Sequence, residues 1–137
     1  MTLEKGRILG VDLGLKRTGL AVSDELWIST RALPNLSPKS RLQDINYLLE
    51  LCQELEIKYL LIGYPLLPQS GEEGFMAKRA SGFFEALKTH LPVSIQAFLI
   101  DESYTSTEAQ KYTSDKDLID GESARILIEN FIHAQNH

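Results

Sequence analysis

Three acidic residues stand where a folded chain could use them for chemistry. Asp12 interrupts the apolar run RILGVDL, Glu102 follows Asp101 at the end of the run VSIQAFLID, and Asp120 comes just before the amphipathic stretch GESARILIENFIHA. Strands of α/β sheets present active groups at their carboxyl ends, where ligands bind. Carboxylates are hard oxygen ligands that suit Mg²⁺, and two such ions about 4 Å apart can promote cleavage of a phosphodiester. The three acids together are therefore a candidate metal cluster.

Each acid also has a structural interpretation, and the residue types alone leave it open. A carboxylate inside a buried strand costs free energy unless it is paired. Asp12 could accept hydrogen bonds from the turn GLKR, form an ion pair with Lys16 or Arg17, or bind a metal ion. Asp120 has the residue type and position of an N-cap, whose side chain accepts from the amides of the first helical turn.

The apolar pattern predicts the elements that must bring the acids together. Residues 7–13 and 18–24 are two short strand-type runs that read as a hairpin. Ser37 as N-cap and Pro38 at the first helical position then open a helix over residues 37–57. Apolar residues recur in it at helical spacing, namely Leu42, Ile45, Leu48, Leu49, Cys52 and Leu55. The further predicted elements are strands at 27–33, 59–63 and 93–101 and helices at 75–91, 105–112 and 121–134.

This order predicts an α/β fold. We expect a mixed sheet of about five strands with helices on both faces, in which right-handed crossovers join the later strands in parallel. At 137 residues the chain fits a single domain, residues 1–137. The residues expected to pack in the core from the later helices are Phe75, Ala80, Phe83, Phe84, Leu87, Ala124, Leu127, Ile128 and Phe131.

Composition and charge exclude several classes of protein. The formal net charge of −5 argues against broad electrostatic adhesion to nucleic acid, so a nucleic-acid role must rest on a local basic patch or a metal. The single cysteine, Cys52, has the pattern of a core residue and excludes a disulfide framework or a cysteine-based zinc site. No stretch approaches the roughly 18 apolar residues of a membrane span. We expect a cytoplasmic protein that does not use a membrane.

Four stretches of the chain resemble the YqgF family. These are RNase H-like proteins described as nucleases of precursor 16S rRNA and formerly as Holliday junction resolvases. ILGVDLGLKRTGLAVSD is similar to the family's opening motif, and YLLIGYPLLPQSGEEG is similar to its strand-Gly-x-Pro loop. LIDESYTSTEA resembles its Asp-Glu-Arg-x-Thr-Thr motif, and IDGESARILIENFI resembles its last helix, which an Asp initiates. The resemblance covers roughly residues 7–133.

The resemblance implies an RNase H-like sheet and a metal-dependent nuclease. It carries the catalytic and metal-binding roles to Asp12, Glu102 and Asp120, with Mg²⁺ or Mn²⁺ as the cofactor. The implied partner is nucleic acid, RNA more than DNA, in 5′-end processing of precursor 16S rRNA and on pre-ribosomal particles. The chain would act as a monomer or a weak homodimer.

The same resemblance explains the turn that follows the first acid. Gly14 and Gly19 would let the hairpin turn tightly. Lys16 and Arg17 would then be substrate-binding residues that contact a phosphate backbone without reading its sequence. Solvated charges at a hairpin tip remain the alternative for both cations.

Departures from the family pattern keep other functions open. Ser103 stands where the family usually has Arg, and TSDKDLID holds Lys116 among three Asp where the family is richer in cations. Fewer cations should weaken nucleic-acid binding. A resolvase-like DNA endonuclease, which would need a symmetric dimer, and a non-catalytic RNA-binding assembly factor are the alternatives. A phosphate binder of the actin and sugar-kinase type needs two related domains, whereas this chain holds one.

Overall fold

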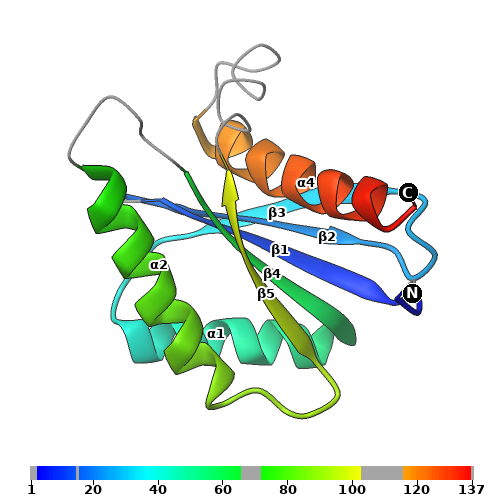
Figure 1. Ribbon diagram of the computed structural model, residues 1–137, viewed down its shortest axis with the longest axis horizontal. Helices are drawn as coiled ribbons and strands as arrows, with labels where there is room; N and C mark the ends of the chain where they lie inside the picture. The colour runs from blue at the N-terminus through cyan, green and yellow to red at the C-terminus, as the bar shows by residue number, and fades with distance from the viewer. Residues whose placement is uncertain (1–2, 15, 66–71, 103–115, 137) are drawn as a thin grey trace.

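A computed structural model describes residues 3–14, 16–65, 72–102 and 116–136 of the chain, with the backbone alone at 65, 72–76, 101–102 and 116–120. Three consecutive strands come first in the chain, and helices then alternate with the two remaining strands (Figure 1). In chain order they are β1 (Arg7–Leu13), β2 (Thr18–Ser23), β3 (Thr30–Leu36), α1 (Arg41–Glu54), β4 (Ile57–Pro65), α2 (Glu72–Lys88), β5 (Gln96–Glu102) and α4 (Lys116–Gln135).

The strands form one mixed sheet in the order β3-β2-β1-β4-β5. The pairs β1–β2 and β2–β3 are antiparallel, whereas β4 lies parallel to β1 and β5 lies parallel to β4. Both parallel pairs are reached through helical connections, as parallel strands require. The expected mixed sheet of five strands is confirmed.

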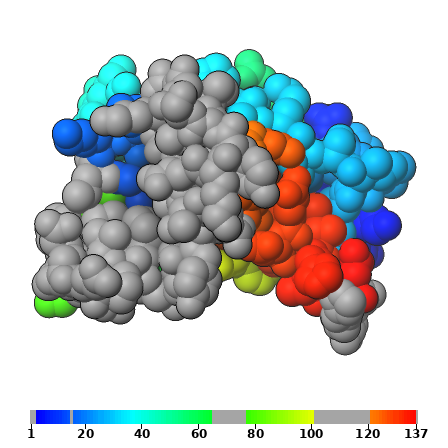
Figure 2. Space-filling view, turned by 90° about the horizontal axis from the view of Figure 1, so that it is seen from above, coloured from blue at the N-terminus to red at the C-terminus, as the bar shows by residue number. Residues whose placement is uncertain are grey.

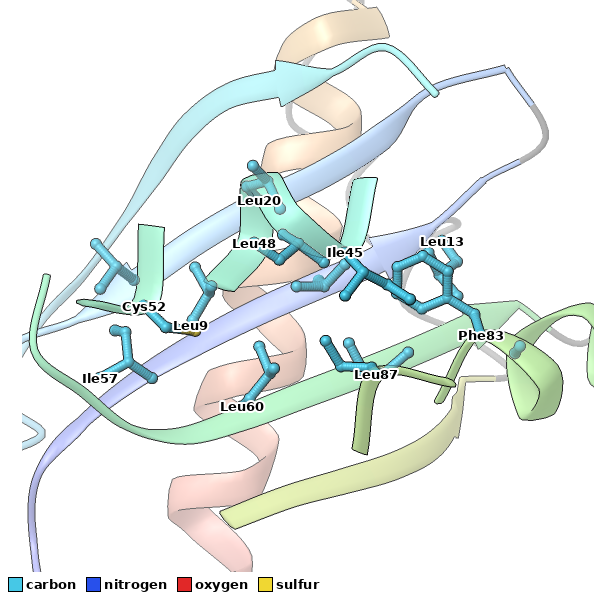
Figure 3. Close-up of a cluster of buried hydrophobic side chains, with 14 residues drawn as sticks. Leu9, Leu13, Leu20, Ile45, Leu48, Cys52, Ile57, Leu60, Phe83 and Leu87 are labelled. Atoms are coloured by element: carbon cyan, nitrogen blue, oxygen red, sulfur yellow. The ribbon is translucent and has the colours of Figure 1, made fainter. Parts of the chain in front are cut away.

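Helices cover both faces of this sheet (Figure 1). Helices α1 and α2 lie on one face, where Leu9, Val11 and Leu13 of β1 join a core that Figure 3 shows in detail. Helix α4 covers the opposite face, where Ile8 of β1 packs in a second core with Phe131. Because both faces are covered, β1 is apolar at nearly every position, as expected of a central strand.

The cores contain most of the residues that the periodicity predicts. Buried side chains from the helices are Ile45, Leu48, Cys52, Ala80, Phe83, Leu87, Ala124, Leu127, Ile128 and Phe131. Leu42 is the exception, with 57% of its side chain exposed. It lies about 120° around the helix from Leu48, because six residues at 100° each bring it off the inward stripe. Phe75 lies outside the described side chains.

Helix α1 begins three residues later than predicted. Its N-cap is Ser40, whose hydroxyl accepts a hydrogen bond from the Gln43 amide at 3.1 Å. The Asp44 carboxylate also accepts from the Lys39 amide at 3.1 Å, which holds the chain before the helix. Ser37 and Pro38 therefore precede the helix, and the prediction of Ser37 as the cap was wrong. The hydroxyl of Ser40 is an equally suitable N-cap. The hydrogen bond between the Lys39 amide and the Asp44 carboxylate favours a helix that begins after residue 40.

Strand β3 also begins three residues later than predicted, because residues 24–29 form a tight loop. The Asp24 carboxylate accepts backbone hydrogen bonds from Ile28 at 2.7 Å and Ser29 at 2.8 Å. Within the loop, Trp27 has a φ of 63°, which no strand residue adopts. Its indole donates to the Gly6 carbonyl at 2.6 Å and its ring lies edge-on to Tyr59. Trp27 packs against the second core, beside Tyr59 and Phe131.

The other predicted elements are present with shifted ends. Strand β4 extends beyond 59–63 in both directions, β5 begins at Gln96 instead of residue 93, α2 runs three residues earlier than 75–91, and α4 begins at Lys116 instead of residue 121. The short helix predicted at 105–112 lies outside the described residues. Among the described residues, no helix is long and apolar enough to span a membrane.

Candidate functional site

Asp12 lies near the carboxyl end of β1, between two residues without side chains. It pairs with Gly19 of β2 and with Gly63 of β4. Cross-strand neighbours normally place Cβ atoms about 5 Å apart on one face of a sheet. Glycine at both positions leaves lateral room beside the carboxylate of a residue that is only 8% exposed. The register thus places Gly19 in β2, within the predicted strand, directly opposite Asp12.

Gly63 lies directly beside Asp12 in the sheet, which the sequence pattern did not reveal. In the sequence, this glycine marks only the end of the apolar run YLLIG. The signal that could have revealed it is a glycine at the carboxyl end of a strand that neighbours an acid-bearing strand. That signal has meaning only once β4 is known to pair with β1 in parallel.

The face of the sheet that Asp12 occupies is the face covered by α4. Alternate residues of a strand share a face, and Asp12 is two residues from Gly10. A Cβ at Gly10 would lie 2.8 Å from the Ala124 carbonyl oxygen and 2.8 Å from Cγ1 of Ile128. The absence of a side chain at residue 10 therefore lets α4 pack directly on β1, beside the strand end that bears Asp12.

The start of α4 reaches the same edge of the sheet. A Cβ at Gly121 would lie 2.8 Å from Cβ of Ala32 and 3.8 Å from the Leu20 carbonyl oxygen. Leu20 is the β2 partner of Val11, and Ala32 pairs with Ala21, the partner of Gly10, so residue 121 lies level with residues 10 and 11 of β1, one or two residues before Asp12. Asp120 directly precedes it in the chain. Figure 2 shows α4, in orange and red, lying alongside the blue and cyan atoms of β2 and β3.

Asp120 is not an N-cap. Helix α4 begins at Lys116, and Asp120 is its fifth residue, in the second turn. The capping interpretation of Asp120 was therefore wrong. Local residue type had favoured it, because Asp before an apolar periodic stretch is typical of a helix start.

Glu102 is the last residue of β5 and belongs to the same edge. Gly63 pairs with Ile100, and Glu102 pairs with Pro65, two residues further toward the carboxyl end. Strand β5 is two places from β1 in the sheet, which corresponds to about 9.6 Å between their backbones. In Figure 1 the arrowhead of β5 and the orange start of α4 lie at the same end of the sheet. The backbones of the three acids thus arrive at one edge from β1, β5 and α4.

The hairpin after Asp12 closes on Gly14. Its amide donates to the Arg17 carbonyl at 3.1 Å, and a Cβ at residue 14 would collide with that oxygen. This agrees with the turn role predicted for Gly14. Lys16 is exposed at the tip and Arg17 is half-buried. Asp12 and Arg17 each make interactions within the chain.

The described side chains contain no group of three His, Cys, Asp or Glu residues able to hold a metal ion. The side chains of Glu102 and Asp120 are not among the described side chains. Cys52 is buried in the core under α1 and α2, on the face opposite Asp12. Burial raises the pKa of its thiol to about 12, which leaves it protonated and a poor metal ligand near neutral pH.

The mixed sheet with helices on both faces is the RNase H-like fold of resolvase-type nucleases. The chain is similar in structure to Thermus thermophilus RuvC in complex with a Holliday junction substrate, with a TM-score of 0.59, 13% identity, and coverage of 93% of this chain and 94% of that one. It is also similar to the yeast mitochondrial Holliday junction resolvase, with a TM-score of 0.60, 12% identity, and coverage of 99% and 81%.

Sequence comparison narrows the class to a family. Residues 6–134 match the RuvX family, described as Holliday junction resolvase. A relative from Sulfurihydrogenibium sp. (strain YO3AOP1), 35% identical over 92% of this chain and 89% of its own length, is named "Putative pre-16S rRNA nuclease". A relative from Crocosphaera subtropica with the same name is 33% identical over 95% and 94%. The chain belongs to the RuvX family of nucleases, which is the YqgF family that its motifs resemble.

Proposed function

We propose that this chain is a divalent-metal-dependent nuclease that processes the 5′ end of precursor 16S rRNA. The names of its relatives support the substrate. The observation that carries the proposal is the position of Asp12, a buried carboxylate at the carboxyl end of a central strand, with glycine on both sides. This position at a strand end, with no side chain opposite it on either neighbouring strand, suits a ligand-binding acid.

Asp12, Glu102 and Asp120 would hold the metal. Three carboxylates without sulfur or imidazole are a donor set for a hard cation such as Mg²⁺ or Mn²⁺. The glycines opposite Asp12 on both neighbouring strands place no side chain beside its carboxylate on the face of α4, where an ion would bind. Ions bound in such sites activate water as a nucleophile and offset the negative charge that develops on a phosphodiester.

The chain's own residues would position the substrate around these acids. Asp12 is held on a central strand that is hydrogen-bonded on both sides, so its carboxylate has a rigid support. Lys16, exposed at the hairpin tip next in the chain, would contact a backbone phosphate, with Arg17 beside it. The close packing of α4 on Gly10 would hold Asp120 at the site.

Cleavage of two substrates in parallel tests the proposal. The substrates are a 5′-extended fragment of precursor 16S rRNA and a four-way DNA junction, each with Mg²⁺, with Mn²⁺ and with a chelator. We expect RNA cleavage that requires metal and falls at least about 100-fold in Asp12→Asn, Glu102→Gln and Asp120→Asn, since even indirect partners of a metal cost 10- to 100-fold. The matched control is Glu50→Gln, which removes a charge from the exposed surface of α1 and should cleave normally.

The family description favours a second candidate, a Holliday junction resolvase. Such an enzyme cuts two strands symmetrically and would need a dimer of this chain. Cleavage of the junction without cleavage of the RNA would replace the first proposal by this one. No cleavage of either substrate by a folded protein that binds no metal would contradict both and leave a non-catalytic assembly factor.

A further inference from the structure

A second polar site lies across the sheet from the acids. A cavity of about 210 Å³ opens between the end of the β1–β2 hairpin, the start of α1 and the face of α2. Its charged lining consists of three cations and one carboxylate, namely Lys39, Arg41, Arg79 and Asp44. This concentration of positive charge is unusual in a chain whose formal net charge is −5.

Arg41 and Arg79 line the same cavity, and neither forms a salt bridge with another of the described residues. Arg41 lies against α2 at Gly82, where a Cβ would be 2.8 Å from its Nη2 atom. Arg79 is one helical turn before Gly82 and lines the same cavity. Its Nη1 atom is buried and makes no hydrogen bond in the part of the chain that the structure describes. A buried guanidinium donor without an acceptor costs free energy, so it calls for an explanation.

The carboxylate in the cavity does not supply that acceptor. Asp44 uses one oxygen to accept from the Lys39 amide at 3.1 Å. Within the described residues, neither Arg41 nor Arg79 is within ion-pair distance of it. The cavity therefore holds guanidinium donors that face an opening instead of an internal acid.

The chemistry of this lining suits a phosphate group. Guanidinium groups bind phosphate through paired N–H donors, and a lysine adds a mobile charge. The amides at the start of a 14-residue helix contribute partial positive charge at the same place. The volume is below the roughly 300 to 1,000 Å³ of pockets that enclose a drug-sized ligand. A single phosphate group fits this site better than a whole nucleotide.

The cavity is also placed along the path to the proposed active site. Leu13 and Thr18, which bracket the hairpin loop, both line it, and Leu13 directly follows Asp12 in β1. Asp12 faces α4, whereas Leu13 faces α1 and α2. The exposed Lys16 lies on the loop between the two faces. A nucleic-acid strand that crosses the carboxyl edge could therefore contact both sites.

We propose that Arg41, Arg79 and Lys39 form a subsite for one backbone phosphate of the substrate strand, outside the acidic centre. The subsite positions the strand and contributes affinity; it takes no part in the chemical step. The inference rests on the proposed nuclease function for its ligand. Its test uses binding without metal, so that failure of cleavage and failure of the subsite are separate results.

The test measures binding of a labelled single-stranded RNA from the precursor 5′ extension, in EDTA and over a range of salt concentrations. Arg79→Gln and Arg41→Gln should each weaken binding by about tenfold, the loss of one charged hydrogen-bonding contact. The slope of log affinity against log salt should fall in magnitude by about 0.7 to 0.9, as for one phosphate contact. Arg79→Lys, which keeps the charge, should retain more affinity than Arg79→Gln. The matched control, Arg31→Gln, removes an exposed arginine from β3 and should leave the affinity and the slope unchanged.

Thermal stability separates a binding role from a structural one. Because the Arg79 Nη1 atom has no acceptor, Arg79→Gln should melt at or above the temperature of the wild type. In active enzyme the same variant should raise KM more than it lowers kcat.

Three results would overturn the inference. The first is an affinity in Arg79→Gln that falls no further than in Arg31→Gln. The second is a lower melting temperature of Arg79→Gln with unchanged RNA binding, which would make the residue structural. The third is stabilisation of the wild type, but not of Arg79→Gln, by inorganic phosphate while RNA binding stays the same in both, which would assign the cavity to a free anion.

Discussion

At the scale of single residues, the environment of Asp12 decides what its carboxylate can do. Both neighbours across the sheet are glycines, and the side chain is almost fully buried. A carboxylate beside other carboxylates is less costly to ionise when a cation is present, because opposite charge favours the ionised form. The residue is therefore expected to couple metal binding to stability.

Divalent metal should stabilise the folded chain through Asp12. A ligand that binds only the native state raises the free energy of unfolding, by about 2.7 kcal/mol at a concentration one hundred times the dissociation constant, and so raises the melting temperature. We expect Mg²⁺ or Mn²⁺ to raise the melting temperature of the wild type and of Glu50→Gln, but not that of Asp12→Asn. Differential scanning calorimetry with and without metal measures this. An equal shift in Asp12→Asn would place the metal elsewhere.

A second residue, Asp24, should make stability depend on pH. Backbone N–H groups donate to its carboxylate, Ser29 first, and lower its pKa from the ordinary value of 3.8. The folded form thus binds the proton less tightly than the unfolded form, so its contribution to stability is complete above about pH 5. This contribution to stability is lost as the pH falls below 3.8 toward the lower pKa that Asp24 has in the folded state.

Comparison of the wild type with Asp24→Asn isolates this contribution from the other acids. The wild type should be more stable near neutral pH, and the difference should shrink as the pH falls through 4. Urea unfolding at several pH values measures the difference. A difference independent of pH would show that loop packing, and not the charge, accounts for it.

At the scale of elements, close packing of α4 on the sheet positions the last of the three acids. Gly10 and Gly121 let the helix approach β1 and β3 more closely than any side chain would allow. The same helix carries Asp120 and the apolar residues of the second core. Packing and site geometry are therefore linked through one helix.

Gly10→Ala should lower both stability and cleavage. The added methyl meets a backbone oxygen of α4 and Ile128, and overpacking of this kind costs about 1 to 3 kcal/mol. Displacement of α4 should also move Asp120. Gly82→Ala is the contrast, because its methyl meets only the end of the Arg41 side chain and alanine favours a helix by up to about 1 kcal/mol. Urea unfolding of both variants is the measurement, and equal effects of the two would contradict the role given to Gly10.

At the scale of the whole molecule, the sheet lies between two hydrophobic cores, one under α1 and α2 and one under α4. Cys52 lies in the core under α1 and α2, and Trp27, the only tryptophan, packs against Tyr59 and Phe131 on the α4 side. Each is a probe of one face. A single domain over residues 1–137 requires that both faces unfold together.

The fluorescence of Trp27 and the accessibility of Cys52 to a thiol reagent should therefore change at the same denaturant concentration. In the native state Cys52 should be unreactive near pH 8, because it is buried and its pKa is raised to about 12. Pulsed thiol labelling across a urea series, beside fluorescence, measures both transitions. Labelling that precedes the change in fluorescence would show two units instead of one.

The sequence by itself determined the order and kind of the elements and the identity of the candidate acids. Periodicity, glycines and turn residues are local signals, so β1, β2, β4 and the apolar faces of the helices could be predicted from them. The ends of elements were less well determined. Ser37 and Ser40 are both good caps, and the choice of Ser40 depends on contacts that include Asp44.

The residues that surround each acid, and the cationic cavity on the other face of the sheet, depend on the tertiary structure. The pairing of Asp12 with Gly63 of β4, the close approach of Gly121 of α4 to Ala32 of β3, and the lining of one cavity by Arg41 and Arg79 each involve residues distant in the chain. A one-residue change of register would move every side chain of a strand to the other face. Register and close approach depend on the packing of the whole sheet, and no local pattern contains them.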